Sequence, residues 1–352
     1  MKRNITFVQS INEAISFSME VDRSVICFGL GVTDPKGVFG TTIGLENKYG
    51  QDRVFDMPTS ENAMTGIGIG AALNGIKSIA THQRLDFFLL AMDQLVNGAA
   101  KWHYMYGSKL NVPITIRLII GRGWGQGPTH SQNLQAWFAH IPGLKVVMPS
   151  TPSDAKGLLI SSILDPNPVI FLEHRWLHNL EGHVPEGDYR VPIGVAKNMH
   201  EGTDITIVSS SYMTIEAMHA AKYLRKYDIK CDVVDLRSIK PIDWDCIIQS
   251  VKKTGKLIVV DSGFSFGSIA SEIISTVTER NFNDLTCAPV KMAMPDVPEP
   301  TSVALTKGFY VRASDIIKKV IKILDLDENN FAKSFEEPIF HDIPGDWFKG
   351  PF

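Results

Sequence analysis

Short runs of β-branched and apolar residues alternate with longer helical patterns along most of the chain. In the first half, the runs rich in Val, Ile and Phe predict strands over 24–29, 53–57, 77–82, 113–120, 145–149 and 168–173. Between them, apolar residues at helical spacing predict helices over 8–22, 61–75, 86–106, 131–140 and 152–164. This alternation predicts parallel sheets with helices on both faces.

The pattern breaks over 175–203, where several Gly and Pro residues predict a linker. It then resumes with strands over 204–211, 231–236 and 256–261 and helices over 213–227, 242–253, 267–280 and 311–324. We therefore predict an α/β fold with two parallel-sheet domains, residues 1–190 and 191–325. A tail, residues 326–352, is rich in Pro, Gly and aromatic residues, and it is either disordered or packed through Phe340, Trp347, Phe348 and Phe352.

Composition narrows the class of protein. The formal charge of −3 over 352 residues gives no reason to expect a nucleic acid or a membrane surface as partner. The apolar run 113–120 contains Arg117 and is too short to span a bilayer, and the N-terminal residues do not form a signal-peptide core. Four widely separated cysteines predict reduced, buried thiols and a cytoplasmic protein.

The segment 58–75, PTSENAMTGIGIGAALNG, combines one carboxylate with a helix of small residues. Glu61 stands at the predicted start of this helix, where it is either a partner of the helix dipole or a buried acid that shares a proton with a ring nitrogen. The run GIGIGA matches a loose dinucleotide-binding pattern, but its glycines lie inside the helix rather than in the turn before it. We interpret these glycines as allowing another helix or a ligand to approach closely.

Two further segments carry candidate chemistry. The glycine-rich stretch 121–133, GRGWGQGPTHSQN, places His130 between a strand and a helix, a common position for a catalytic residue. A solvated or helix-capping histidine is the alternative interpretation. The turn 165–168, DPNP, is an ordinary turn by its sequence. Its oxygens can hold a cation only if the backbone conformation directs them to one point.

Many motifs in order resemble the beta subunit of the thiamine-diphosphate-dependent 2-oxo acid dehydrogenases of the pyruvate, branched-chain and acetoin type. They include 58–75, DFFLLAMDQLVNGAAKWHYMYG (86–107), THSQNLQAWFAHIPGLKVVMPSTPSDAKGLL (129–159), VVDLRSIKPID (233–243) and MPDVPEP (294–300). The resemblance covers about 1–325. It implies a transketolase-like pyrimidine-binding domain followed by a transketolase C-terminal domain.

The resemblance also implies roles for single residues. In this family, a glutamate at the position of Glu61 hydrogen-bonds the aminopyrimidine ring of thiamine diphosphate and favours the imino tautomer, which can take the proton from the thiazolium carbon. His130 matches the family's active-site histidine in a His-Ser-Gln run. A monovalent-cation site, for K⁺, is implied at Asp165 and Asn167 with main-chain oxygens around Ile114, Ser162 and Ile163.

One departure from the family pattern concerns the diphosphate. The chain contains no Gly-Asp-Gly followed by Asn, the segment that holds Mg²⁺ and the diphosphate. It therefore supplies half of an active site, and an alpha subunit supplies the rest. We expect an assembly of two alpha and two beta subunits, with a beta–beta contact through the second domain and helix 61–75.

The second departure is at Leu85, where the family usually has Phe or Tyr stacked on the pyrimidine. In the run THQRLDFF (81–88), His82 and Arg84 are also unusual beside the cofactor pocket. An arginine there suits a phosphate or a carboxylate of the substrate, which argues against the ordinary pyruvate or branched-chain substrates.

These observations give one main functional hypothesis and two alternatives. The main hypothesis is a beta subunit of an enzyme that decarboxylates a 2-oxo acid and transfers the acyl group to the lipoyl group of an acyltransferase. The first alternative is half of a split transketolase-like enzyme that moves a ketol unit between sugars, which His82, Arg84 and Leu85 favour slightly. The second is a non-catalytic scaffold, against which the presence of Glu61 and His130 argues.

Overall fold

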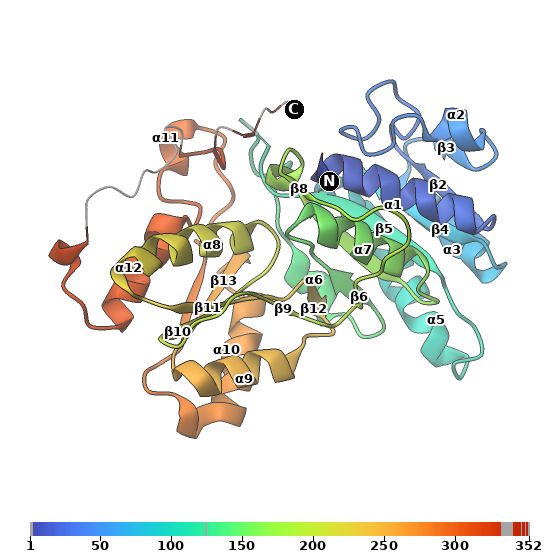
Figure 1. The fold of residues 1–352 in the computed structure, drawn as a ribbon. Helices are drawn as coiled ribbons and strands as arrows, with labels where there is room; N and C mark the ends of the chain where they lie inside the picture. The colour runs from blue at the N-terminus through green and yellow to red at the C-terminus, as the bar shows by residue number, and fades with distance from the viewer. Residues whose placement is uncertain (1–2, 124, 332–340, 346, 349, 351–352) are drawn as a thin grey trace. The chain divides into compact units, whose positions relative to one another are not determined.

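The computed structural model of the chain describes residues 3–123, 125–331, 341–345, 347–348 and 350 (Figure 1). Its contacts divide the chain into two compact units. Unit 1 comprises Met1–Gly121, Trp137–Ile193 and Ile239–Pro241, and unit 2 comprises Arg122–Ala136, Gly194–Ser238 and Ile242–Phe352. The predicted α/β class with two parallel-sheet domains is confirmed.

Unit 1 contains a seven-stranded sheet in the order β12-β6-β7-β5-β4-β2-β3. Its strands are β2 (Val25–Gly29), β3 (Val54–Asp56), β4 (Lys77–His82), β5 (Ile114–Ile120), β6 (Lys145–Val147), β7 (Val169–His174) and β12 (Ser238–Lys240). The pairings from β6 to β3 are all parallel. Residues that follow these strands therefore gather at one edge, which we call the carboxyl edge.

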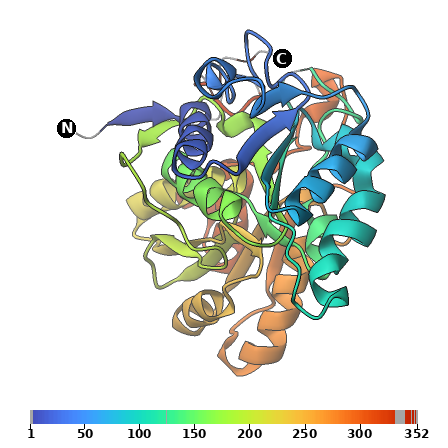
Figure 2. The same ribbon diagram turned by 90° about the vertical axis from the view of Figure 1, so that its right-hand side faces the viewer.

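Helices cover both faces of this sheet. Figure 2 shows α1 (Phe7–Val21) and α7 (Pro152–Ile163) on one face and α3 (Glu61–Leu73) and α5 (Ala100–Met105) on the other. Gly68 allows α3 to pack closely, because a Cβ there would lie 2.8 Å from Cζ of Phe28. Gly70, in contrast, faces open space. The remaining short elements of unit 1 are α2 (Leu45–Tyr49), α4 (Leu85–Phe88), η1 (Leu89–Ala91), η2 (Gln94–Ala99) and η3 (Arg175–Leu177). Helix α6 (Gln135–His140) begins in unit 2 and continues in unit 1 from Trp137.

The prediction of a single helix over 86–106 is wrong in detail. The segment divides into α4, a 3₁₀ turn (η1), a π-helical segment (η2) and α5. Asn97 and Gly98 lie in the π-helical part. Both are weak α-helix formers, so this part of the segment has the least preference for regular α-helix.

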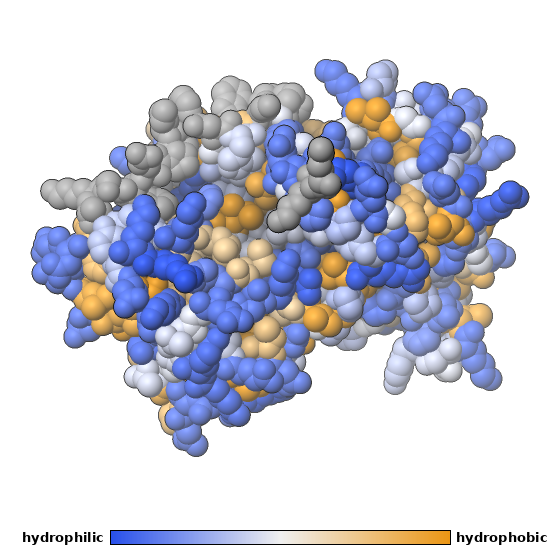
Figure 3. All heavy atoms as spheres, in the orientation of Figure 1, coloured by the Kyte–Doolittle hydropathy of each residue, from blue (hydrophilic) through white to orange (hydrophobic). Residues whose placement is uncertain are grey.

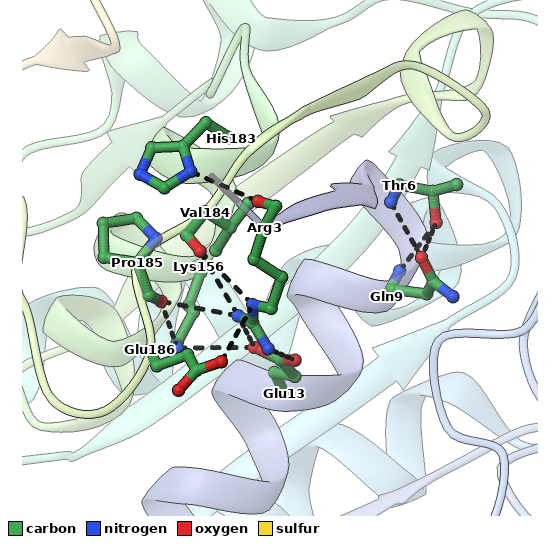
Figure 4. A network of polar contacts seen from close by, with 9 residues as sticks. All are labelled: Arg3, Thr6, Gln9, Glu13, Lys156, His183, Val184, Pro185 and Glu186. Carbon is green, nitrogen blue, oxygen red and sulfur yellow. Dashed lines mark hydrogen bonds and ion pairs between the residues drawn. The ribbon is translucent and has the colours of Figure 1, made fainter. Parts of the chain in front are cut away.

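The N-terminus is tied to residues of the predicted linker. Strand β1 (Asn4–Thr6) pairs antiparallel with β8 (Glu181–His183), neither of which was predicted. Figure 4 shows the polar contacts beside this pair: Arg3 donates two hydrogen bonds to the Glu13 carboxylate, at 2.6 and 2.9 Å, and Lys156 donates to the carbonyl of Pro185 at 2.9 Å. The first part of 175–203 is therefore a structured part of unit 1.

Unit 2 contains a five-stranded sheet in the order β14-β13-β10-β11-β9. Its strands are β9 (Lys197–His200), β10 (Ile205–Ser209), β11 (Cys231–Asp235), β13 (Leu257–Phe264) and β14 (Val290–Met294). Strand β9 is antiparallel to its neighbour and the other pairings are parallel. Strands β9 and β14 were missed because they carry Lys, Asn, His and Met rather than β-branched residues.

Helices also cover both faces of the second sheet. Figure 1 shows α8 (Tyr212–Leu224) and α12 (Ala313–Ile323) on one face and α9 (Trp244–Thr254) and α10 (Ile269–Asn281) on the other. Short helical elements complete the unit: η4 (Arg225–Tyr227), η5 (Phe282–Asp284), α11 (Val303–Thr306) and η6 (Glu328–Asn330). In the tail, Phe348 is buried and Trp347 is half-buried, whereas Phe340 and Phe352 lie outside the described residues.

The surface and the cysteines add little that is specific to function. On the face shown in Figure 3, hydrophilic side chains predominate and hydrophobic ones lie between them in small groups. All four cysteines are free thiols, but only Cys27 and Cys231 are buried; Cys246 and Cys287 are half-buried. Among the described residues, no helix is both long enough and apolar enough to cross a membrane.

A buried ion pair joins the two central strands of unit 1. Arg117 of β5 donates to both carboxylate oxygens of Glu173 of β7, at 2.6 and 3.0 Å, and the two side chains are 1% and 0% exposed. Burial alone would raise the pKa of Glu173, but the charge of Arg117 and then the ring of His178, whose Nε2 lies 3.6 Å from the carboxylate, hold it below its ordinary value. The carboxylate is therefore ionised in the folded protein.

Three histidines are buried near the carboxyl edge. Burial is the main cause that lowers the pKa of His82 and His174 to about 3 and that of His178 to about 4. All three are thus neutral in the folded protein at neutral pH.

We expect Glu173→Gln to lower the free energy of unfolding by about 3–5 kcal/mol, because it leaves the charge of Arg117 buried without its partner. Asp188→Asn is the control, since Asp188 forms an exposed ion pair with Arg190 in the same unit, and about 0–1 kcal/mol is expected there. Urea unfolding measures both. A loss for Glu173→Gln no larger than for the control would contradict a stabilising role of the pair.

Acidification is expected to destabilise unit 1 through the buried histidines. Their folded pKa values lie below the unfolded value, so their contribution is complete above about pH 6.5 and is lost as the pH falls toward about 3. His82→Leu removes one such group and should reduce the slope of unfolding free energy against pH by about 1.4 kcal/mol per unit near pH 5. The exposed His219, changed to Leu, is the control. An unchanged slope in His82→Leu would show that His82 is not buried in its neutral form.

Candidate active site

Glu61 is the first residue of α3, which begins at the carboxyl edge because it follows β3. Its side chain is buried, with 7% exposure, and within the described part of the chain its carboxylate has no hydrogen-bond or ion-pair partner. The helix N-terminus favours a negative charge there. A buried carboxylate nonetheless costs free energy unless a donor meets it. An external donor, such as a protonated ring nitrogen, therefore suits this position.

His82 and Leu85 follow β4 at the same edge. His82 ends the strand and is 1% exposed, and neither of its ring nitrogens has a hydrogen-bond partner among the described residues. Its ring lies edge-on to Phe88, with the centroids 4.8 Å apart. Leu85 is fully buried at the first position of α4, so an aliphatic side chain with no exposed surface stands where the resembling family has an aromatic ring.

Arg84 lies beside a second arginine that sequence reasoning missed. Nη1 of Arg84 donates to the carbonyl oxygen of Gly121 at 2.9 Å, and its guanidinium lies 5.8 Å from the ring centre of Phe39. Arg175, which follows β7, lies 4.6 Å from the same ring. Burial, and then the nearby charge of Arg84, lowers the pKa of Arg175 to about 10. Two buried guanidinium groups thus approach each other at the carboxyl edge.

His130 lies in unit 2, although its sequence position is within the predicted first domain. We call residues 122–136 the His130 segment. The imidazole is exposed, and its Nδ1 is 3.1 Å from Oγ1 of Thr129. The helix predicted from 131 begins only at Gln135, because Asn133 donates from its side chain to the carbonyl of Ser131, and such local bonds compete with a helix. Glu61 and His130 are therefore each positioned by a different unit.

The proposed cation ligands gather at the opposite edge of the unit 1 sheet, around the start of β5 and the end of α7. The Asp165 carboxylate accepts hydrogen bonds from Nζ of Lys145 at 2.5 and 2.7 Å, so its charge is already compensated. The backbone N–H of Asp165 donates to the carbonyl of Ser162 at 3.2 Å. Among the described residues, the buried Oδ1 of Asn167 has no hydrogen-bond partner, which leaves one side-chain oxygen suited to a cation.

Family models match both domains. The transketolase pyrimidine-binding domain matches residues 3–179, and the transketolase C-terminal domain matches residues 194–316. Among solved structures, a split-gene transketolase, described as an inactive beta4 tetramer, has a TM-score of 0.73 at 22% identity and covers 92% of this chain and 99% of its own. At that identity, the likeness shows the fold alone.

Several curated relatives are similar over most of their length. The acetoin:2,6-dichlorophenolindophenol oxidoreductase subunit beta of Cupriavidus necator is 42% identical, covering 90% of this chain and 96% of its own. The 2-oxoisovalerate dehydrogenase subunit beta of Bacillus subtilis is 40% identical, covering 89% and 96%. The pyruvate dehydrogenase E1 component subunit beta of Rickettsia felis is 39% identical, covering 91% and 98%.

The three relatives are named for different substrates at nearly equal identity, so overall identity does not select a substrate. They agree on the kind of subunit, and the two domain matches agree on the fold. The resemblance seen in the motifs is therefore confirmed, and the chain belongs to the family of thiamine-diphosphate-dependent 2-oxo acid dehydrogenase beta subunits.

Proposed function

We propose that this chain is the catalytic beta subunit of a two-chain enzyme that decarboxylates a 2-oxo acid and passes the acyl group to a lipoyl carrier. The observation that carries this is the Glu61 carboxylate, which is buried without a partner at the start of α3. The family resemblance assigns the pyrimidine contact to this same residue. A mostly buried carboxylate that has no donor within the described residues is expected of a residue that meets a ligand.

The residues of unit 1 suit thiamine diphosphate. When bound, this cofactor supplies an acidic carbon that becomes a nucleophile and then an electron sink. Glu61 would hold and share a proton at the pyrimidine nitrogen, and Leu85 would stand at the position where the family usually stacks an aromatic ring on it. His130, exposed on its own segment, would serve the later proton transfers.

The remaining ligands come from outside this chain. Because the chain lacks the Gly-Asp-Gly segment, Mg²⁺ and the diphosphate would be held by an alpha subunit. A monovalent cation such as K⁺ would use Oδ1 of Asn167 and the main-chain oxygens of Ile114, Ser162 and Ile163. Asp165 would contribute less than the resemblance implies, because Lys145 already neutralises its carboxylate.

An assembly of two alpha and two beta subunits is consistent with the outer side of α3. Ile67 is 57% exposed, Gly70 faces open space, and Leu90 of the adjacent η1 is 68% exposed. These residues form an apolar surface without a bulky side chain at Gly70, and a second beta subunit could cover it. A lipoyl acyltransferase would be the further partner that receives the acyl group.

We propose that the substrate carries an anionic group that meets Arg84. The support is the proximity of Arg84 and Arg175, whose like charges are buried at the carboxyl edge, where ligands bind to parallel sheets. An anion there would interact with both guanidinium groups, with the neutral His82 nearby as a hydrogen-bonding group. The same observation supports the second candidate, ketol transfer between phosphorylated sugars. The acceptor, a lipoyl domain or an aldose, distinguishes the two.

Glu61→Gln tests the proposed function. The amide keeps the shape of the side chain but cannot hold the proton at the pyrimidine nitrogen. In the complex reconstituted with the alpha subunit, we expect hydrogen–deuterium exchange at the thiazolium carbon to slow by about a hundredfold to ten-thousandfold. Affinity for the cofactor should change much less.

Glu46→Gln is the matched control, because Glu46 also lies in the first turn of a helix in unit 1. Exchange in this variant should equal that of the parent. If Glu61→Gln also exchanges at the parent rate, Glu61 only stabilises the start of its helix, and the proposed function loses its main support.

Arg84→Met tests the anionic substrate. It removes a charge-assisted contact, so we expect the Michaelis constant for the true substrate to rise at least tenfold, while the dissociation constant of the cofactor stays within about twofold. Arg53→Met is the control, since Arg53 donates to backbone carbonyls of Met19, Asp22 and Val25 near the opposite edge of the sheet. An equal rise of the Michaelis constant in both variants would mean that Arg84 stabilises the fold and does not contact the substrate.

A further inference from the structure

The described part of the C-terminal tail is attached to the first residue of the His130 segment. Oδ2 of Asp342 lies 3.3 Å from Nη2 of Arg122, and their side chains are 3% and 0% exposed. Arg122 and Asp342 are 220 positions apart in the sequence, and both belong to unit 2. Asp342 lies beyond the 194–316 match to the transketolase C-terminal domain, whereas Arg122 lies within the 3–179 match to the pyrimidine-binding domain.

Arg122 joins the tail to a third segment. Its Nη1 donates to the carbonyl oxygen of Pro300 at 2.6 Å, and Nη2 donates to that of Thr301 at 3.3 Å. The same turn touches the middle of the His130 segment, because a Cβ on Gly127 would lie 2.1 Å from Oγ1 of Thr301. One guanidinium group therefore fixes the start of the segment against two other parts of unit 2.

The other end of the His130 segment is held by side-chain hydrogen bonds. Asn133 donates to Glu299 at 3.4 Å, and Gln135 donates to Asp261 at 2.6 Å. His130 lies between these two attached ends and is exposed. Its position therefore depends on how well both ends are held.

The tail has anchors of its own in unit 2. Nη2 of Arg312 donates to the carbonyl oxygens of Ile343 and Pro344, at 3.0 and 3.4 Å. The guanidinium of Arg312 lies 3.5 Å from Glu216, whose other oxygen accepts the backbone N–H of Ala313 at 2.8 Å. Asp342 is thus presented to Arg122 from a fixed backbone, which makes the ion pair between them a rigid connection.

We propose that the C-terminal tail positions the His130 segment, and that Asp342 does so through Arg122. Without the Asp342 carboxylate, the buried charge of Arg122 loses its ion-pair partner and the start of the segment loosens. His130 then leaves the place from which it acts. Asp342 and Arg122 are positioning residues in this account, and its catalytic part rests on the function proposed above.

Asp342→Asn in the full chain, reconstituted with the alpha subunit, tests the structural part. We expect amide hydrogen exchange within 122–133 to become at least tenfold faster, because local opening now costs less. Exchange in α7 of unit 1 and in α10 of unit 2 should stay unchanged, which shows that both units remain folded. Glu328→Gln removes one charge from an exposed tail position and is the matched control. Unchanged exchange within 122–133, or equal acceleration in α10, would overturn the proposal.

Kinetics of the same variants test the catalytic part. Misplacement of His130 should lower kcat by roughly tenfold to a hundredfold, with the Michaelis constant and the exchange at the thiazolium carbon unchanged, because the latter depends on Glu61. Asp342→Glu keeps the charge and should recover most of kcat. Faster segment exchange with an unchanged kcat would show that the tail does not position His130. If the reconstituted parent is inactive, the proposed function fails, and the amide exchange still decides whether the tail holds the segment.

Discussion

The buried pair of Arg117 and Glu173 fixes how the two central strands of unit 1 lie beside each other. If one strand slipped by one residue, the two side chains would lie on opposite faces of the sheet, and neither charge would have its partner. With this register, the end of β5 meets the end of β7, and a Cβ on Gly121 would lie 2.4 Å from the ring of His174. Arg84 hydrogen-bonds to the same glycine, so the arrangement of the carboxyl edge depends on this pairing.

Much of the fold follows from local pattern. The strands and helices with strong periodicity have nearly the predicted bounds, since burial and secondary structure impose the same period on them. The position of Glu61 at a helix start was also predictable, because Ser60 and the apolar run after it are local signals. In contrast, β1 and β8 are three residues each, and they become strands only by pairing with each other.

The missed parts of the site depend on contacts between distant residues. Arg175 and Phe39 meet over 136 positions, and nothing in either local sequence points to the other. The His130 segment follows β5 in the sequence, yet it belongs to unit 2 because Arg122, Asn133 and Gln135 each bond to residues more than 120 positions away. Periodicity carries no information about such side-chain bonds, so the placement of His130 could not have been predicted from it.

The long sequence separation between Arg122 and Asp342 has a consequence for biosynthesis. The His130 segment leaves the ribosome about 200 residues before the tail that contacts it, which at 5–20 residues per second corresponds to roughly 10–40 s. Through most of that interval, the chain has not yet reached the carbonyl groups at 300–301, and the carboxylate at 342 comes only at its end. The nascent chain can complete the sheet of its first unit while its histidine-bearing segment still lacks these contacts, so this segment is among the last parts of the chain to order.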